Sequence, residues 1–509
     1  MSTESTSPKH SPLVIGTGVF ALLWVVARAA VQSVTIDEAD TYLTHVWRPG
    51  LSSWDPGANN HVLNSLLMRL LTTIFGASPF TMRLPALIGA ALYIGAVYCL
   101  VRHISGRPLR QWSLLVCLTC SPFVMDYLVA ARGYSMASAF LMWMIALAVC
   151  HQAKEAEARA AGLLRTCALI SVSGALAISA NFSFAIAAAF TALGLFLWIC
   201  REHRRQYFRI LTAFTLPGLA VAYFFVGSVV QAWPKGQFTW GAKSLDQTIR
   251  GLVSASLFEP NNYLLNPRLH HQFVHFGTFL YPLLAAFVLW RLVAVFFDRA
   301  AIQEAGARRL AAVAAIGGGA LVLALVCHQI LYSFFGILLP LDRTAMYVVL
   351  LFLLMAGSLA AIPLPSLMGR VSGRALAATL TLIACYNIGC LRLTYFNEWK
   401  YDADMKNVYS VLTYYNHTYG VTKVSSNWRY LAVLNCYRTL SGRETIEQIP
   451  GAPSVVNYYP PGFQAYVVYY PWDEGFFKRE GLKLVYHDPF TDVAVVVRPE
   501  VLSTAPAAR

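Results

Sequence analysis

Hydrophobic stretches long enough to cross a membrane constrain this chain more than any other feature. The sequence is 57% hydrophobic and only 13% charged. A membrane-spanning helix needs about 20 apolar residues, and helices satisfy their own backbone hydrogen bonds in lipid. The sequence therefore predicts a polytopic α-helical membrane protein with about eleven spans. They are expected at 12–34, 84–101, 111–124, 133–151, 165–180, 182–200, 210–230, 273–297, 310–331, 344–363 and 375–395.

The placement of charge predicts the orientation of these spans. A net charge of +14 can indicate nucleic-acid binding, but residues 396–509 hold equal numbers of basic and acidic side chains. The excess lies in the short loops that contain Arg102, Lys154, Arg201, Arg299 and Arg370. These loops fall on one side if the N-terminus is cytoplasmic, as the positive-inside rule requires. We therefore expect contacts with membrane lipids and none with nucleic acid.

Residues 396–509 differ in character and predict a small α/β domain outside the membrane, following a transmembrane domain over 1–395. Short runs rich in Val and Tyr are typical of strands. We expect strands at Val421–Ser425, Ala465–Tyr470, Leu482–Tyr486 and Asp492–Arg498, and helices at Asp404–His417, Trp428–Leu440 and Glu474–Glu480. By the charge rule this domain lies on the extracytoplasmic side.

Asp37 and Glu38 directly follow the first span, with Asp40 close behind. Carboxylates at the edge of a bilayer are costly and often functional. A carboxylate can deprotonate or orient a reacting hydroxyl, and Asp37 is the candidate base. Two other interpretations stay open: the pair is simply solvated at the interface, or it pairs with Arg83.

The stretch Val62–Phe75 is amphipathic and predicts a helix that lies flat on the membrane. His61 precedes it, and a lone histidine is more often a satisfied polar residue than a ligand. Asn60 and Asn64 are four residues apart, so on a helix they share one face. There their amide groups can hydrogen-bond the hydroxyls of a bound ligand.

The same predicted outer side receives two arginines near span ends. Arg343 follows a turn at Pro340, and Arg132 is flanked by Asp126 and Tyr134. Guanidinium groups in such places bind phosphate, or form structural ion pairs, or reach to lipid headgroups.

The long loop 231–272 lies on this side too and mixes aromatic and basic residues, among them Trp240, Lys243 and Arg268. Aromatic rings suit sugars, but an interfacial aromatic belt is an equal alternative. His270, His271 and His275 have no fixed acid nearby, so we do not predict a metal site there.

Four segments follow one another along the chain: Asp37-Glu38, Asn59–Leu70 leading to Phe75-Gly76 and Arg83-Leu84-Pro85, Ser121–Phe123 through Ala131–Tyr134, and Pro340–Thr344. In this order they resemble the GT-C superfamily of polyprenyl-phosphate-sugar-dependent glycosyltransferases. Within it, the chain is most similar to bacterial relatives of protein O-mannosyltransferases and aminoarabinose transferases, the glycosyltransferase family 39 type. Two positions depart from the family pattern: Val62, where proline is common, and Gly133, where an apolar residue is common.

The resemblance implies an inverting transferase in a bacterial inner membrane. It would move a sugar from a polyprenyl-phosphate donor to a hydroxyl of a lipid, glycan or protein acceptor on the outer face. Asp37 would be the general base, and Glu38 would orient the acceptor or, with Asp37 and His61, hold a divalent metal. Candidate phosphate ligands are Arg132, Arg343, Lys243 and Arg268; candidate sugar or acceptor ligands are Asn60, His61, Asn64, Asp126, Tyr134 and Trp240.

Three other functions remain open from the sequence. A flippase for lipid-linked saccharides predicts ionisable residues at mid-membrane, whereas those here lie mainly at span ends. A membrane-anchored assembly protein leaves Asp37 and Glu38 unexplained. An O-antigen ligase or polymerase-like enzyme would centre on Arg268 and His271 in the large outer loop.

Overall fold

The chain is built mainly of long apolar helices that are candidate membrane spans. The computed structural model describes residues 11–57, 59–232, 240–257, 261, 267–442, 445–450 and 459–503. Within these residues ten helices are long and apolar enough to cross a membrane, and a bent pair makes the eleventh. This confirms the predicted membrane fold. The spanning helices are α1 (Pro12–Val31), α4 (Pro79–Ile104), α7 (Tyr134–Gln152), α8 (Ala156–Ala180), α9 (Ala185–Glu202), α10 (Tyr207–Gln231), α12 (Pro267–Phe297), α13 (Ala305–Phe335), α14 (Met346–Ala361) and α15 (Leu367–Gly389).

The short third span of the sequence is the bent pair. Helices α5 (Pro108–Thr119) and α6 (Pro122–Val129) meet at an angle of 57°. The break falls at Ser121-Pro122, where proline removes a backbone donor and forces the preceding residue out of the helical region. The bend delivers the chain after α6 to the candidate site.

The segment after α1 folds over the end of the helical bundle. It contains α2 (Ile36–Thr41), the π-helix η1 (Tyr42–Val46), the 3₁₀ turn η2 (Ser52–Trp54) and α3 (Val62–Phe75). Thr35 caps α2, because its hydroxyl accepts from the Glu38 N–H while the Glu38 carboxylate accepts from the Thr35 N–H. This capping box fixes the Glu38 carboxylate at the start of α2.

The C-terminal region forms the small α/β fold that the sequence predicts. A four-stranded sheet has the order β1-β2-β4-β3, with β1 parallel to β2 and the other pairs antiparallel. The strands are β1 (Val424–Ser426), β2 (Ala465–Tyr469), β3 (Lys483–Asp488) and β4 (Val493–Val497), and the helices are η7 (Lys400–Asp402), α16 (Met405–Tyr419), α17 (Trp428–Ser441), α18 (Glu474–Arg479) and α19 (Pro499–Ser503).

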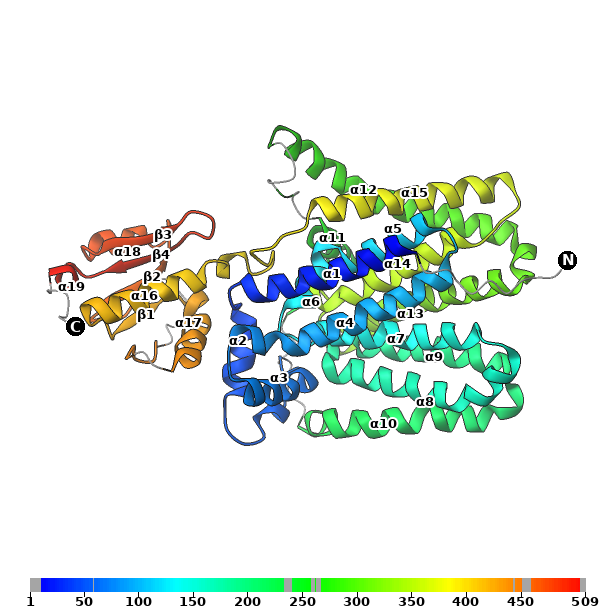
Figure 1. Ribbon diagram of the computed structural model, residues 1–509, viewed down its shortest axis with the longest axis horizontal. Helices are drawn as coiled ribbons and strands as arrows, with labels where there is room; N and C mark the ends of the chain where they lie inside the picture. Colours follow the sequence, from blue (N-terminus) through cyan, green and yellow to red (C-terminus); the bar gives the residue numbers. More distant parts are fainter. Residues whose placement is uncertain are drawn as a thin grey trace.

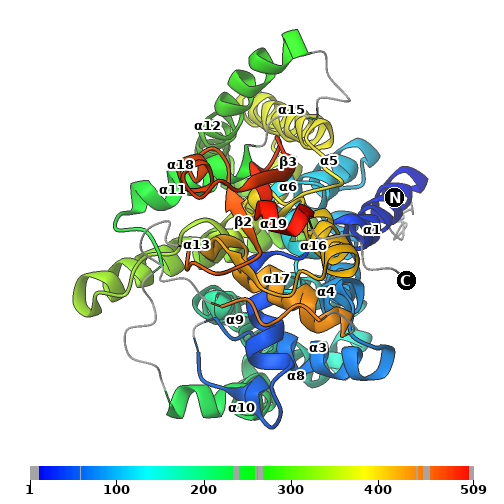
Figure 2. The same ribbon diagram turned by 90° about the vertical axis from the view of Figure 1, so that its left-hand side faces the viewer.

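This domain packs on the first loop rather than standing apart. Val34, Ala39 and Tyr42 share one hydrophobic cluster with Val408 and Val433. Figure 1 shows the sheet at one end of the bundle beyond α2 and α3, and Figure 2 looks onto that end. The basic loops gather at the opposite end, where Arg159, Arg201 and Arg299 line one cavity. Which end faces the cytoplasm stays a prediction.

Candidate active site

Glu38 is a structural anchor. Its carboxylate accepts from Arg83 Nε at 2.9 Å, Arg83 Nη2 at 2.8 Å, the Thr35 N–H at 2.9 Å and the Ala131 N–H at 2.8 Å. Burial raises the pKa of Glu38, but the Arg83 ion pair and these bonds outweigh it and hold the pKa below its ordinary value. Of the interpretations that the sequence left open, pairing with Arg83 is the one that the structure shows for Glu38. Both oxygens are engaged in these bonds, so Glu38 anchors the first loop in this structure. Its expected role in catalysis or metal binding stays a prediction.

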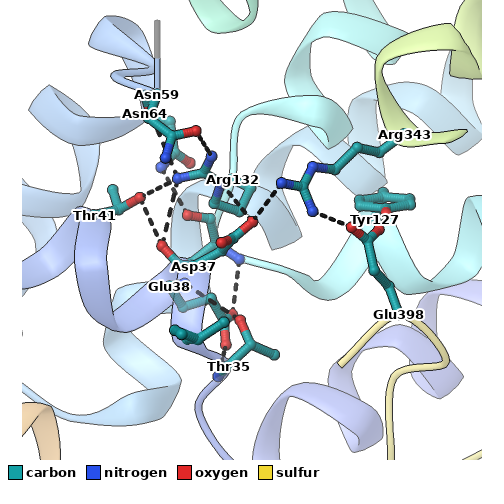
Figure 3. Close-up of polar contacts among 12 residues, drawn as sticks. Thr35, Asp37, Glu38, Thr41, Asn59, Asn64, Tyr127, Arg132, Arg343 and Glu398 are labelled. Atoms are coloured by element: carbon teal, nitrogen blue, oxygen red, sulfur yellow. Dashed lines mark hydrogen bonds and ion pairs between the residues drawn. The ribbon is translucent and has the colours of Figure 1, made fainter. Parts of the chain in front are cut away.

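Asp37, the preceding residue, extends toward the candidate site. Its Oδ2 lies 3.0 Å from Arg343 Nη2 and 4.0 Å from Arg132 Nε (Figure 3). This oxygen is buried and makes no hydrogen bond among the described residues. The expected convergence of Asp37, Arg132 and Arg343 is therefore present.

Arg132 is held in place by the turn between α6 and α7. It donates to Thr41 Oγ1 at 2.6 Å and to Asn59 Oδ1 at 2.9 Å, and its side chain is buried. Gly133 follows with φ +58°, and a Cβ there would approach the Ala180 carbonyl oxygen to 2.1 Å. Only glycine fits at this position.

Glu398 is a site residue that the sequence did not reveal. Arg343 bonds Glu398, and the Tyr127 hydroxyl donates to the same carboxylate. The Arg343 guanidinium also lies over the Trp399 ring, 5.7 Å from its centroid. Burial raises the pKa of Glu398 above its ordinary value, although Arg343 and Tyr127 act in the opposite sense. The one feature of the sequence that could have pointed to Glu398 is its position just after the last predicted span, on the predicted outer side.

A cavity of about 340 Å³ opens beside this cluster. Its polar lining includes Asn59, His61, Arg132, Tyr134 and Arg343, and Trp240 lines it as well. Its remaining wall is mainly apolar and includes Phe182, Ile186, Leu331, Ile337, Leu338 and Leu339. The cavity therefore presents two guanidinium groups next to a hydrophobic lining.

His61 faces this cavity as a neutral group. Burial, with Arg132 and Arg343 nearby, puts its pKa well below the ordinary value. Its Nε2 is buried without a hydrogen-bond partner, and its ring lies 5.5 Å from that of Tyr134. His61, Tyr134 and Trp240 are thus brought together as expected.

Two other predicted ligands, Asn60 and Asn64, do not line the cavity. Asn60 precedes α3, so it does not share a helical face with Asn64. Its amide donates to the Ser53 and Asp55 carbonyls, and Asn64 donates to the Ala131 carbonyl.

Asp126 pairs with Arg28 at 2.5 Å and accepts from the Asn397 N–H at 2.9 Å. This ion pair joins α6 to α1. Asp126 therefore packs α6 against α1 and does not line the active-site cavity; its expected role in binding an acceptor stays a prediction.

The loop 231–272 was expected to supply phosphate ligands to the site. The Lys243 side chain is exposed and does not line the cavity. The side chains of Arg268, His270 and His271 lie outside the described residues. Among the residues that are described, no group of three or more His, Cys, Asp or Glu side chains is placed to hold a metal ion.

Asp402 ties the C-terminal domain to α2, because its Oδ2 accepts from the Ile36 N–H at 2.7 Å. Burial raises the pKa of Asp402 well above the ordinary 3.8, and the nearby charges of Asp37 and Glu38 raise it further. The hydrogen bond from the Ile36 N–H acts in the opposite direction. The folded state therefore holds this proton more tightly than the unfolded chain, so stability falls as the pH rises from 3.8 through the raised pKa.

We expect Asp402→Asn, which stays neutral and keeps an acceptor for Ile36, to unfold at higher temperature than wild type at neutral pH. Its unfolding temperature should also depend less on pH. Thermal unfolding in detergent from about pH 4 to about pH 8 measures both. Asp55→Asn, at an exposed position, is the control and should leave the wild-type profile unchanged; an unchanged Asp402→Asn profile would contradict this account.

Neither a family model nor a curated protein sequence matches the chain. Solved structures with a similar fold outline include ArnT from Cupriavidus metallidurans bound to undecaprenyl phosphate. That comparison has a TM-score of 0.45 and 13% identity, and covers 96% of this chain and 98% of the other. Arabinosyltransferase EmbB from Mycobacterium smegmatis has a TM-score of 0.35 and 14% identity, over 78% of this chain and 43% of that one. The function proposed below rests on the side chains of the site.

Proposed function

We propose that this protein is an inverting glycosyltransferase that moves a sugar from a polyprenyl-phosphate donor to an acceptor hydroxyl at the outer face of a bacterial inner membrane. One observation carries the proposal. The Asp37 carboxylate meets the guanidinium groups of Arg132 and Arg343, and these two arginines line a largely apolar cavity. The acceptor would be a lipid, a glycan or a protein.

The cavity suits a lipid phosphate better than a soluble phosphate. Arginine forms charge-assisted hydrogen bonds to phosphate oxygens, and both arginines are largely buried, at 2% and 16% exposed. Phe182, Ile186 and Leu331 continue the lining with apolar groups. A polyprenyl chain buries against such a wall, since apolar surface gains about 25 cal/mol for each Å² removed from water.

The transfer step follows from these positions. Asp37 accepts the proton of the acceptor hydroxyl, whose oxygen forms a bond to the anomeric carbon. The bond from that carbon to the phosphate oxygen breaks, and the released electron pair leaves a polyprenyl phosphate whose charge Arg132 and Arg343 stabilise. In the free protein Arg343 pairs with Asp37 and Glu398. A donor phosphate competes for Arg343 and so releases the Asp37 carboxylate for the proton.

Purified full-length protein in detergent, supplied with a panel of polyprenyl-phosphate sugars and lipid, glycan and protein acceptors, tests the proposal. We expect sugar transfer from at least one donor, and binding of polyprenyl phosphate that is at least tenfold tighter than binding of the matching polyprenol. Movement of intact donor across liposomes without transfer would favour the flippase. Turnover that depends on Arg268 and His271 but not on Asp37 would favour the O-antigen ligase type.

Arg343 should be irreplaceable by lysine. Its Nη1 bonds Glu398 while its Nη2 approaches Asp37, and a lysine ammonium cannot keep both positions. We expect Arg343→Lys to lower kcat/KM for the donor by about 100-fold, the loss of one charge-assisted hydrogen bond of roughly 2–3 kcal/mol. Steady-state kinetics measure this. Arg250→Lys, at an exposed pair with Asp246, should keep wild-type kinetics, and an equally active Arg343→Lys would remove Arg343 from the donor site.

A further inference from the structure

A basic cavity of about 880 Å³ lies at the opposite end of α9 and α13 from the candidate active site. The first residues of α9 and the last turns of α13 line the active-site cavity, whereas the end of α9 and the start of α13 line this one. Figure 1 shows both helices running along the bundle. The two cavities therefore lie at opposite ends of these helices, toward opposite faces of the membrane.

The lining of this cavity is strongly cationic. It holds five arginines and one acid, Glu202. Glu202 lies 3.8 Å from Arg159 in a partly exposed pair, which is a weak interaction. The Nε of Arg309 is buried and makes no hydrogen bond to the described residues. The arginines are Arg159, Arg201, Arg299, Arg308 and Arg309.

An apolar groove of about 340 Å³ continues from the basic cavity along the same two helices. Small residues of α13 line one side of the groove, including Ala312, Ala315 and Gly319. Leu193 and Leu197 of α9 line the other side. Both leucines are exposed on a helix of membrane-spanning length, at 45% and 58%. Trp198, Arg201, Ala312 and Ala315 line both spaces and join them.

The geometry points to a binding site for one anionic phospholipid, with its phosphate among the arginines and an acyl chain in the groove between α9 and α13. Basic pockets between spanning helices at the positively charged face attract acidic headgroups. Small residues on α13 leave the width that an acyl chain needs. The groove is what favours a lipid over a soluble phosphate, because a soluble anion would leave that apolar surface unused. The site is separate from the proposed transfer chemistry.

Native mass spectrometry of the full-length protein in non-ionic detergent tests the headgroup contacts. We expect wild type to retain phosphatidylglycerol at least tenfold more tightly than phosphatidylcholine. Arg201→Gln combined with Arg308→Gln should weaken phosphatidylglycerol binding about 30-fold, roughly fivefold for each arginine. The matched control is Arg370→Gln with Arg374→Gln, which removes equal charge from exposed positions outside the cavity and should change binding less than twofold.

A second variant tests the acyl chain. A Cβ at Gly319 meets no atom within 4 Å, and Gly319 lines the groove, so Gly319→Leu places apolar atoms in the groove and should weaken phosphatidylglycerol binding about tenfold. Gly16→Leu on α1, where the space is equally open, is its control. Equal weakening by the Arg370/Arg374 pair, equal retention of phosphatidylcholine, or tight binding of soluble glycerol phosphate that Gly319→Leu does not alter would each overturn the lipid site. Thermal unfolding of each variant checks that it is folded.

Discussion

Asp37→Asn should abolish sugar transfer while leaving donor binding nearly intact. A positioned general base contributes about 10²–10⁴-fold to a rate, and an amide cannot take the proton. The substitution is nearly isosteric, and Arg343 keeps its ion pair with Glu398. We therefore expect kcat to fall at least 100-fold and the Kd for polyprenyl phosphate to change less than about threefold. Single-turnover transfer and equilibrium binding of the donor separate the two effects.

Asp40→Asn is the matched control for this variant. Asp40 lies on the same helix, and among the described residues its carboxylate accepts one long hydrogen bond, from Thr44 Oγ1 at 3.4 Å. It should transfer sugar at the wild-type rate. Full activity of Asp37→Asn would remove Asp37 as the base, and a loss of donor binding equal to the loss of rate would mean that Asp37 orders the site rather than reacts.

Periodic features of the sequence predicted the architecture well because they are local. The length and apolar composition of each span are set by the hydrocarbon core that it must cross. The Val-rich runs at Ala465–Tyr470 and Asp492–Arg498 correspond to β2 and β4 within one residue at each end. The orientation rule also brought Asp37, Arg132 and Arg343 to one side, and they do meet.

Contacts between distant residues were beyond local reasoning. Glu398 contacts Tyr127 across 271 positions and Arg343 across 55, and nothing nearby in the sequence distinguishes it from a solvated acid. Asn60 was placed on a helical face by spacing alone. Its side chain instead binds backbone carbonyls of the preceding loop, as asparagine often does just before a helix, and α3 begins only at Val62.

Glu38→Gln should lose activity for a different reason from Asp37→Asn, because it should unfold. Glu38 and Arg83 are each 1% exposed, and Arg83 also donates to the carbonyls of Ala29, Gln32 and Ser33 at the end of α1. Removing one charge leaves the other buried without compensation, which costs about 3–5 kcal/mol. The thermal transition should therefore fall well below that of Asp37→Asn.

The lowered pKa of Glu38 also predicts how its contribution to stability changes with pH. Because the folded state holds that pKa below the ordinary 4.5, the stability that Glu38 contributes is present above pH 4.5 and is lost as the pH falls through the lowered pKa. Glu38→Gln, which mimics the protonated acid, should lack this acid-sensitive phase. Glu202→Gln is the control, since its pair with Arg159 is exposed and should contribute less than about 1 kcal/mol. A Glu38→Gln protein that is as stable as wild type yet inactive would return Glu38 to the chemistry of the site, beside Asp37.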